Sequence, residues 1–274
     1  MSGRPRSCIV LTRPAGRNQI LSASLRGAGF NVLDMPVLAV SALPYDVESF
    51  VWPDDYQLMV FVSVNAVDFY VARLKAMMAG ARAQVDLGSV MLAAVGPSTA
   101  ARLRNEPLFR AASVVAPVEG YTFDSEGLLA TLEPDLPLVS KAVIVRGQAG
   151  RNWLAEQLSS RGIRVDRYAV YQRHPVNWSD TGLQVLKNCV HEGGRLTVLL
   201  TSAEAVDAFC ANLKAGDLAY LLGAMRFVVI HERVAARLQS QLRSIPDAQV
   251  MPGVKLCAPD DESMLRAIML SATL

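Results

Sequence analysis

The sequence predicts an α/β protein in which each of two halves carries a parallel sheet with helices on both faces. Short apolar runs alternate along the chain with polar turns and with helical stripes of apolar residues, as in sheets whose strands are buried on both faces. The same arrangement of residues returns about one domain later, and 274 residues suffice for two domains of ordinary size.

The clearest unit lies in the middle of the chain. The apolar run 142–145 has strand character, and Gly147 and Gly150 suit a tight turn after it. A helical stripe follows and ends near Gly162, which is well placed as a C-cap, before an extended pattern leads to Tyr171. The turn of such a β-α-β unit presents free backbone N–H groups and favours anionic ligands.

The chain opens with a related unit. The run 8–11 has strand character, and the Gly-Arg-Asn at 16–18 recurs at 150–152. In the register of this repeat, Leu38 falls opposite Tyr171. The two halves are therefore expected to contain equivalent strands, turns and helices.

Two further turns of the first half have counterparts in the second half. Ser63 and Asn65 stand where the N-cap of a helix belongs, and Ser202 stands there in the counterpart. The next turn begins at Gly96, and its counterpart begins at His231. Strand, polar turn and helix thus alternate throughout both halves, which predicts the parallel sheets.

The composition excludes several classes of protein. An apolar fraction of 51% with 19% charged residues argues against disorder, and no apolar run reaches the roughly 18 to 20 residues of a membrane helix. The apolar run 8–11 is too short for a signal peptide. We therefore expect a soluble, cytoplasmic protein with no membrane partner. The net charge of +2 indicates no nucleic-acid partner.

The cysteines and histidines do not form a metal-binding or disulfide pattern. Cys8, Cys189, Cys210 and Cys257 lie far apart without a C-x-x-C spacing, and the three histidines do not cluster with them. This spacing argues against a disulfide framework and against a structural zinc site, so we expect no metal.

Seven short motifs follow one another along the chain: 12–14, 61–67, 94–100, 125–128, 146–147 with 150–151, 170–173, and 201–202 with 205–206. Each motif is weak alone, but together they cover nearly the whole chain. In their joint order and spacing they resemble uroporphyrinogen-III synthases, the enzymes that close the tetrapyrrole ring in haem biosynthesis. One turn departs from the family pattern, because 231–235 reads His-Glu-Arg-Val-Ala where a Gly-x-x-Thr-Ala-like turn is expected.

The resemblance implies two doubly wound, flavodoxin- or Rossmann-like domains joined by a two-stranded linker, with the substrate in a central cleft at the carboxyl ends of both sheets. The chain would cross the linker twice. The resulting ranges are 1–37 plus 176–274 for one domain, 43–169 for the other, and 37–42 and 170–176 for the linker strands.

The resemblance also implies a reaction. The family's substrate is linear hydroxymethylbilane, a polycarboxylate, which loses its terminal hydroxyl as water, inverts ring D through a spiro intermediate and closes into a macrocycle. The implied enzyme is a lyase that needs no cofactor. Loss of the hydroxyl is helped by a general acid, and Tyr171 occupies the family's Val-Tyr-x-Arg position. Positioning of the curled bilane is expected to supply most of the acceleration.

The turns at the strand ends supply the expected substrate contacts. The residues assigned to substrate binding are Arg13, Ser63, Asn65, Gly96, Ser98, Thr99, Arg146, Gly147, Gly150, Ser202, Ala203 and His231. Some of them also have a purely structural interpretation. Ser63, Asn65 and Ser202 suit helix N-caps, each contributing about 1 kcal/mol, and Gly96 and Gly147 suit backbone geometry. His231 suits a capping or surface position, and the ring of Tyr171 can simply pack against a domain. We expect a monomer that receives the bilane by transient hand-over from the upstream hydroxymethylbilane synthase.

A non-catalytic two-domain protein that binds a small anionic ligand is the alternative. It would show the same duplicated pattern, but such proteins are usually exported, and no signal peptide is recognisable. A nucleotide-binding or receiver-like module would need a G-x-G-x-x-G turn or an aspartate cluster at the strand ends, and neither pattern occurs in the sequence.

Overall fold

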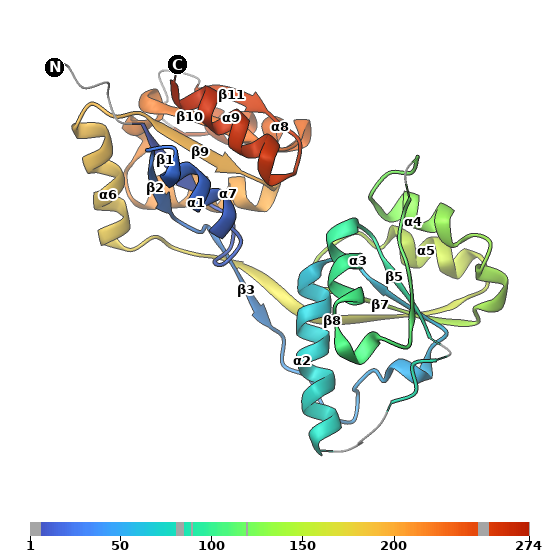
Figure 1. Cartoon of the computed structure of the whole chain (residues 1–274). Helices are drawn as coiled ribbons and strands as arrows, with labels where there is room; N and C mark the ends of the chain where they lie inside the picture. Colours follow the sequence, from blue (N-terminus) through green and yellow to red (C-terminus); the bar gives the residue numbers. More distant parts are fainter. Residues whose placement is uncertain (1–6, 81–84, 89, 119, 246–251, 274) are drawn as a thin grey trace. The chain divides into compact units, whose positions relative to one another are not determined.

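The computed structural model describes residues 7–80, 85–88, 90–118, 120–245 and 252–273, and it divides into two compact units (Figure 1). Unit 1 comprises Met1–Ala39 and His174–Leu274, and unit 2 comprises Val40–Arg173. The chain passes from one unit to the other within the ranges predicted as linker strands. Of the helices in the described ranges, none is long and apolar enough to cross a bilayer.

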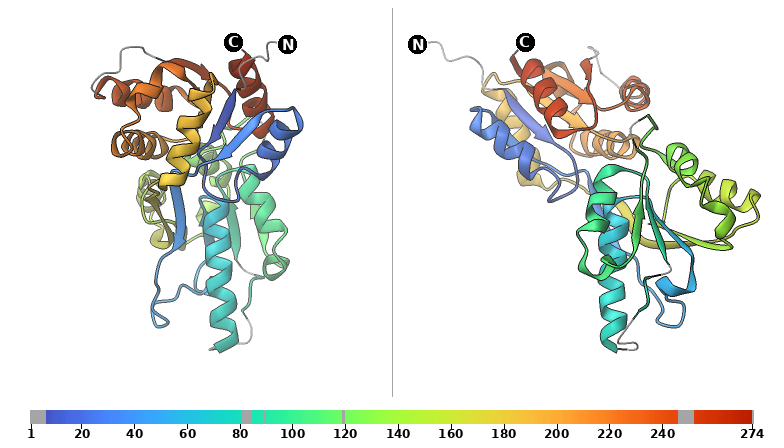
Figure 2. Two further views of the ribbon diagram at one scale, coloured as in Figure 1. Left: turned by 90° about the vertical axis from the view of Figure 1, so that its left-hand side faces the viewer. Right: turned by 45° about the vertical axis from the view of Figure 1, so that its right-hand side comes forward.

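Unit 1 contains a five-stranded sheet in the order β11-β10-β9-β1-β2, with all four neighbouring pairs parallel. The strands are β1 (Cys8–Leu11), β2 (Asn31–Asp34), β9 (Leu196–Leu200), β10 (Met225–Val229) and β11 (Gly253–Leu256). The helices are α1 (Gln19–Gly27), α6 (Asp180–His191), α7 (Ala203–Ala215), α8 (Glu232–Arg243) and α9 (Asp261–Thr273). Figure 2 shows the N-terminal strand lying among the C-terminal elements, as its pairing with β9 requires.

Unit 2 is built around a six-stranded sheet in the order β3-β8-β7-β4-β5-β6. Its strands are β3 (Leu38–Ala42), β4 (Leu58–Phe61), β5 (Met91–Ala94), β6 (Ser113–Val115), β7 (Lys141–Gly147) and β8 (Arg164–Pro175). Its helices are α2 (Val64–Gly80), α3 (Pro97–Arg104), α4 (Ser125–Leu132) and α5 (Trp153–Ser160).

Both central sheets are covered on both faces, because successive residues of a strand point to opposite sides. In β1, Cys8 and Val10 join one hydrophobic cluster while Ile9 and Leu11 join another. The residues of β4 divide in the same way between the two clusters of unit 2. This double covering explains why the strands are continuous apolar runs, and it confirms the predicted fold class of two doubly wound α/β units.

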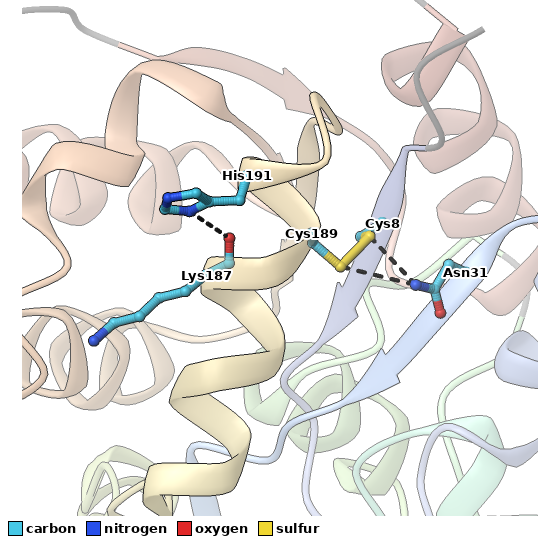
Figure 3. Close-up of a disulfide and its surroundings, with 5 residues drawn as sticks. All are labelled: Cys8, Asn31, Lys187, Cys189 and His191. Carbon is cyan, nitrogen blue, oxygen red and sulfur yellow. Dashed lines mark hydrogen bonds between the residues drawn. A yellow bond between two sulfur atoms is a disulfide. The ribbon is translucent and has the colours of Figure 1, made fainter. Parts of the chain in front are cut away.

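Unit 1 contains a disulfide that corrects the expectation drawn from the cysteine spacing. Cys8 of β1 is bonded to Cys189 of α6, and the side-chain amide of Asn31 donates to both sulfurs (Figure 3). The two cysteines are 181 residues apart in the sequence. Only the packing of the first chain segment into the C-terminal half brings them together, so sequence spacing held no sign of the pair.

Candidate active site

The candidate site forms where β7 ends beside β8. The two strands pair in even register from Lys141 opposite Arg164 to Arg146 opposite Ala169, and the register then slips so that Gly147 lies opposite Tyr171. The backbone N–H of Gln148 donates to the carbonyl oxygen of Tyr171 at 2.8 Å. The irregularity therefore places the tyrosine directly against the turn that follows β7.

Tyr171 is almost fully buried, with 3% of its surface exposed. Its hydroxyl lies 3.1 Å from Oγ of Ser63, and its ring stacks on Phe69 with the centroids 5.8 Å apart. The guanidinium of Arg173 lies 5.8 Å from the ring centroid. A Cβ at Gly147 would come within 2.8 Å of Cζ of the tyrosine, so this approach requires glycine.

The hydroxyl of Ser63 contacts both the backbone of α2 and the hydroxyl of Tyr171. It directly precedes α2, and its Oγ accepts a hydrogen bond from the N–H of Ala66 at 3.1 Å. The cap uses one lone pair and leaves the hydroxyl proton and the second lone pair for Tyr171. The predicted N-cap is thus present, and it also orients the phenol.

Arg146 organises the turn after β7 from inside. Its side chain donates to the carbonyl oxygens of Gly147 at 3.1 Å and Arg151 at 3.2 Å, and to Oδ1 of Asn152 at 2.9 Å. Gly150 has φ +144°, and a Cβ there would lie 2.7 Å from Nη2 of the arginine. The turn therefore packs closely against the guanidinium of Arg146, a residue that is 8% exposed.

The charge of Arg146 has only neutral partners in the part of the chain that the structure describes. All of its hydrogen-bond acceptors there are carbonyl or amide oxygens, and none of the ion pairs among the described residues involves it. Burial lowers the pKa of Arg146, and the nearby positive charge of Arg167 lowers this pKa further.

Two cavities of unit 2 meet at this turn. The first, of about 230 Å³, is lined by the hydroxyl-bearing residues Ser63, Ser125 and Tyr171 together with Arg146 and Arg151. The second, of about 380 Å³, also includes Arg146 and the turn but reaches Arg167, Ala169 and Asn152 instead. We call the larger cavity, which has Arg146 and Arg167 in its lining, the two-arginine cavity. It shares Arg146 and the turn with the smaller cavity, which Tyr171 lines.

Arg73 of α2 holds the strand that carries the tyrosine. It is 5% exposed, and it donates to the carbonyl oxygens of Ala169 at 3.2 Å, Val170 at 3.0 Å and Leu43. These contacts fix the two residues before Tyr171. The sequence holds no sign of this role, because Arg73 sits on a helix with ordinary spacing.

The structure brings five of the predicted site residues together. Ser63, Arg146, Gly147, Gly150 and Tyr171 all line the smaller cavity. Ser125 and Arg151 join them. These two residues lie in motifs of the family resemblance, so the sequence carried a signal for both. Arg167 lies outside every motif and becomes visible only through the pairing of β7 and β8.

The other predicted residues of unit 2 lie elsewhere. Asn65 is half-buried in the first turn of α2, and Gly96 precedes α3 with extended backbone. Ser98 is exposed, whereas Thr99 is buried. None of these four lines either of the two cavities.

The predicted residues of unit 1 are occupied by local contacts. Arg13 pairs with Asp261 at 2.8 Å. Oγ of Ser202 accepts from the N–H of Ala205 at 3.0 Å, and Nδ1 of His231 accepts from the N–H of Arg233 at 3.0 Å. Both side chains therefore act as helix N-caps, the structural interpretation foreseen for them. Ala203, also among the predicted residues, is exposed in the first turn of α7.

Fold and site define a two-unit, doubly wound α/β protein whose strand-end turns converge on a buried tyrosine and on uncompensated arginines. The family model of uroporphyrinogen-III synthase HemD matches residues 19–246. The chain therefore belongs to the uroporphyrinogen-III synthase family, whose enzymes act in tetrapyrrole and haem biosynthesis.

Solved structures share the fold. A uroporphyrinogen-III synthetase from Helicobacter pylori is 16% identical with a TM-score of 0.59, covering 97% of this chain and 99% of that chain. A mutant uroporphyrinogen III synthase from Thermus thermophilus is 17% identical with a TM-score of 0.55, with the same coverage. At these identities, the similarity speaks for the architecture.

Proposed function

We propose that this protein is a cofactor-independent lyase that cyclises linear hydroxymethylbilane with inversion of ring D through a spiro intermediate and release of water. One observation carries the proposal beyond family membership. The hydroxyl of Tyr171 is held by Ser63 at the wall of a cavity that also carries arginine side chains. This combination suits a substrate that must both lose a hydroxyl and hold many carboxylates in place.

Tyr171 is the proposed general acid. A phenol can donate its proton to the departing hydroxyl of the bilane, which leaves as water and creates an azafulvene-like cation. Either hydroxyl of the Ser63–Tyr171 pair can be the donor. When the phenol donates to Oγ of Ser63 in the free enzyme, the substrate hydroxyl takes over an existing hydrogen bond. Burial of the ring against Phe69 restricts the direction of the O–H.

Positioning is assigned to the turns and arginines. Charge-assisted contacts from Arg146 and its neighbours would hold carboxylates of the curled bilane, which brings its two ends within reach of each other. Free bilane closes spontaneously without the inversion, so the proposal includes its transient hand-over from the upstream synthase. The proposed enzyme is a monomer. Contacts at the carboxyl ends of both sheets and the cytoplasmic location stay predictions.

The first experiment is an isomer assay. Freshly generated hydroxymethylbilane is supplied with and without the protein, the products are oxidised, and uroporphyrin isomers I and III are separated by chromatography. Spontaneous closure gives isomer I, so we expect a protein-dependent shift to isomer III. Isomer I alone from folded protein would sink the enzyme proposal and leave the anion-binding alternative.

Tyr171→Phe tests the general acid. We expect kcat to fall about tenfold, because the reactive cation forms readily once the bilane is held and the acid adds a modest share. Tyr121→Phe is the matched control, since Tyr121 is an exposed tyrosine of the same unit. An unchanged kcat in Tyr171→Phe would remove the tyrosine from the chemistry and return it to packing.

A further inference from the structure

The larger cavity at the end of β7 contains positive charge without a visible counter-charge. Its volume is about 380 Å³, and the residues that line it include Arg146 and Arg167 but no acidic residue. Among the described residues, no carboxylate forms an ion pair with either arginine. Two like charges beside a common cavity repel each other, and an anion between them would relieve this repulsion.

The cost is greater at Arg146 than at Arg167, because Arg146 as a residue is only 8% exposed whereas Arg167 is exposed. A buried charge is ordinarily paired, and here the acceptors are two backbone carbonyl oxygens of the turn, the carbonyl oxygen of Arg151 among them, and one side-chain amide. These acceptors orient the guanidinium and leave its charge uncompensated. Arg73 is also buried and, among the described residues, has carbonyl acceptors only, but it lines neither cavity. Arg146 lines a cavity beside a second arginine, and this arrangement points to an anionic occupant.

Unit 1 shows what the same position holds when its charge is balanced. Arg13 stands in β1–turn–α1 where Arg146 stands in β7–turn–α5, and each donates to the asparagine that precedes the helix at 2.9 Å. Arg13 also meets the carboxylate of Asp261 at 2.8 Å. The repeated turn thus already holds an arginine against a carboxylate once in this molecule.

We propose that the cavity between Arg146 and Arg167 is a subsite for the paired acetate and propionate carboxylates of one pyrrole ring of the substrate, with Arg167 as its specificity-determining residue. This proposal rests on the proposed function. The cavity has the size for the substituents of one ring rather than for a tetrapyrrole, and two guanidinium groups match two carboxylates. The shared chemistry is a small anion, which a free phosphate also provides.

The kinetic test is Arg167→Gln. We expect KM for hydroxymethylbilane to rise about tenfold with kcat within about twofold, because a charge-assisted contact to a remote carboxylate is lost while the reacting centre is intact. Arg167→Lys keeps the charge without the forked geometry, so its KM should lie between those of wild type and Arg167→Gln. Arg164→Gln is the control: it is an exposed arginine of the same strand that lies outside the cavity lining. An unchanged KM in Arg167→Gln would overturn the proposal.

A binding test works without turnover. A monopyrrole that carries one acetate and one propionate side chain, and inorganic phosphate, are titrated by calorimetry at fixed ionic strength. We expect the monopyrrole to bind wild type and Arg164→Gln alike and Arg167→Gln about tenfold more weakly. Equal affinity for phosphate, with no preference for the monopyrrole, would overturn the substrate subsite in favour of a general anion site. No binding of either probe would overturn both.

These outcomes separate the two proposals. If wild type yields isomer III and Arg167→Gln behaves like wild type, the subsite fails and the enzyme function stands. If wild type yields only isomer I, the enzyme function fails, and the monopyrrole titration then decides whether the cavity binds paired carboxylates at all. Circular dichroism of each variant serves as the control for folding. We expect spectra like that of wild type, because the Arg164 and Arg167 side chains are exposed.

Discussion

The molecule contains the same strand–turn–helix unit twice, and the two copies differ in how the arginine at the strand end is neutralised. Cys8 pairs with Asn31 and Lys141 pairs with Arg164, so both strand pairs join residues 23 apart in the sequence. The glycine that follows each helix has a left-handed backbone, with φ +86° at Gly29 and +82° at Gly162. The frame of the unit has thus been kept in both halves.

Within this common frame the charges have diverged. Arg13 and Arg146 both bind the asparagine that starts the helix, but only Arg13 has a carboxylate partner, supplied by α9 of its own unit. The hydrogen bond from the arginine to the asparagine is present in both copies, which indicates a structural role. The unbalanced charge is the feature that sets the second copy apart as a site.

Unit 1 also contains the Cys8–Cys189 disulfide, and its removal is the change with the largest expected effect on stability. Cys8→Ala combined with Cys189→Ala should lower the free energy of unfolding by about 3 kcal/mol, because the bond closes a long loop of the unfolded chain. Hydrogen exchange resolved by peptide should show the loss in unit 1, since unit 2 contains no cysteine. Cys257→Ala removes a free thiol as the control. Equal loss of protection in both units would contradict this localisation.

A carboxylate placed in the cavity of unit 2 would remove the difference in charge between the two copies. Ala169 lines the two-arginine cavity, and the carboxylate of Ala169→Asp should offset one of its two positive charges. We expect KM for hydroxymethylbilane to rise about thirtyfold, close to 2 kcal/mol, because the new carboxylate competes with those of the substrate.

Ala169→Asn is the matched control for this variant, since it adds the same bulk without the charge. Its KM should rise only a few-fold. Equal KM values for the Asp and Asn variants would show that the cavity excludes substrate by size, and that its charge is not used.

The reciprocal change removes the carboxylate partner of Arg13 in unit 1, and its expected effect on stability is the smallest. Asp261→Asn should lower the free energy of unfolding by about 1 kcal/mol or less, because Asp261 is 38% exposed and water screens its pair with Arg13. Urea titration measures the change. Glu262→Gln is the control, because its ion pair with Arg266 is exposed on both sides and should contribute nothing measurable. A loss well above 2 kcal/mol would mean that Arg13 is held as a buried charge.

The pattern of apolar runs was sufficient for the fold class, because strands covered on both faces must be apolar at every position, as in β1 and β4. The caps were equally readable. Ser63, Ser202 and His231 each satisfy an N–H of the helix that follows them, which is a local requirement of any helix start. Side chains that act within a few residues of themselves can be inferred from local order.

The sequence alone determined the duplicated α/β architecture and the helix caps, because these depend on periodicity and on neighbours along the chain. The candidate tyrosine came from the family resemblance of its motif, and its catalytic role stays a prediction. Only the tertiary structure decided the partners of distant residues. Three contacts arise when separate elements of the chain become neighbours in the fold. They are the bond of Cys8 to Cys189, the hydrogen bonds of Arg73 to the strand before Tyr171, and the approach of Arg146 and Arg167 to one cavity. The balance of charge at a site is such a property, since any segment of the fold can supply or withhold the counter-ion.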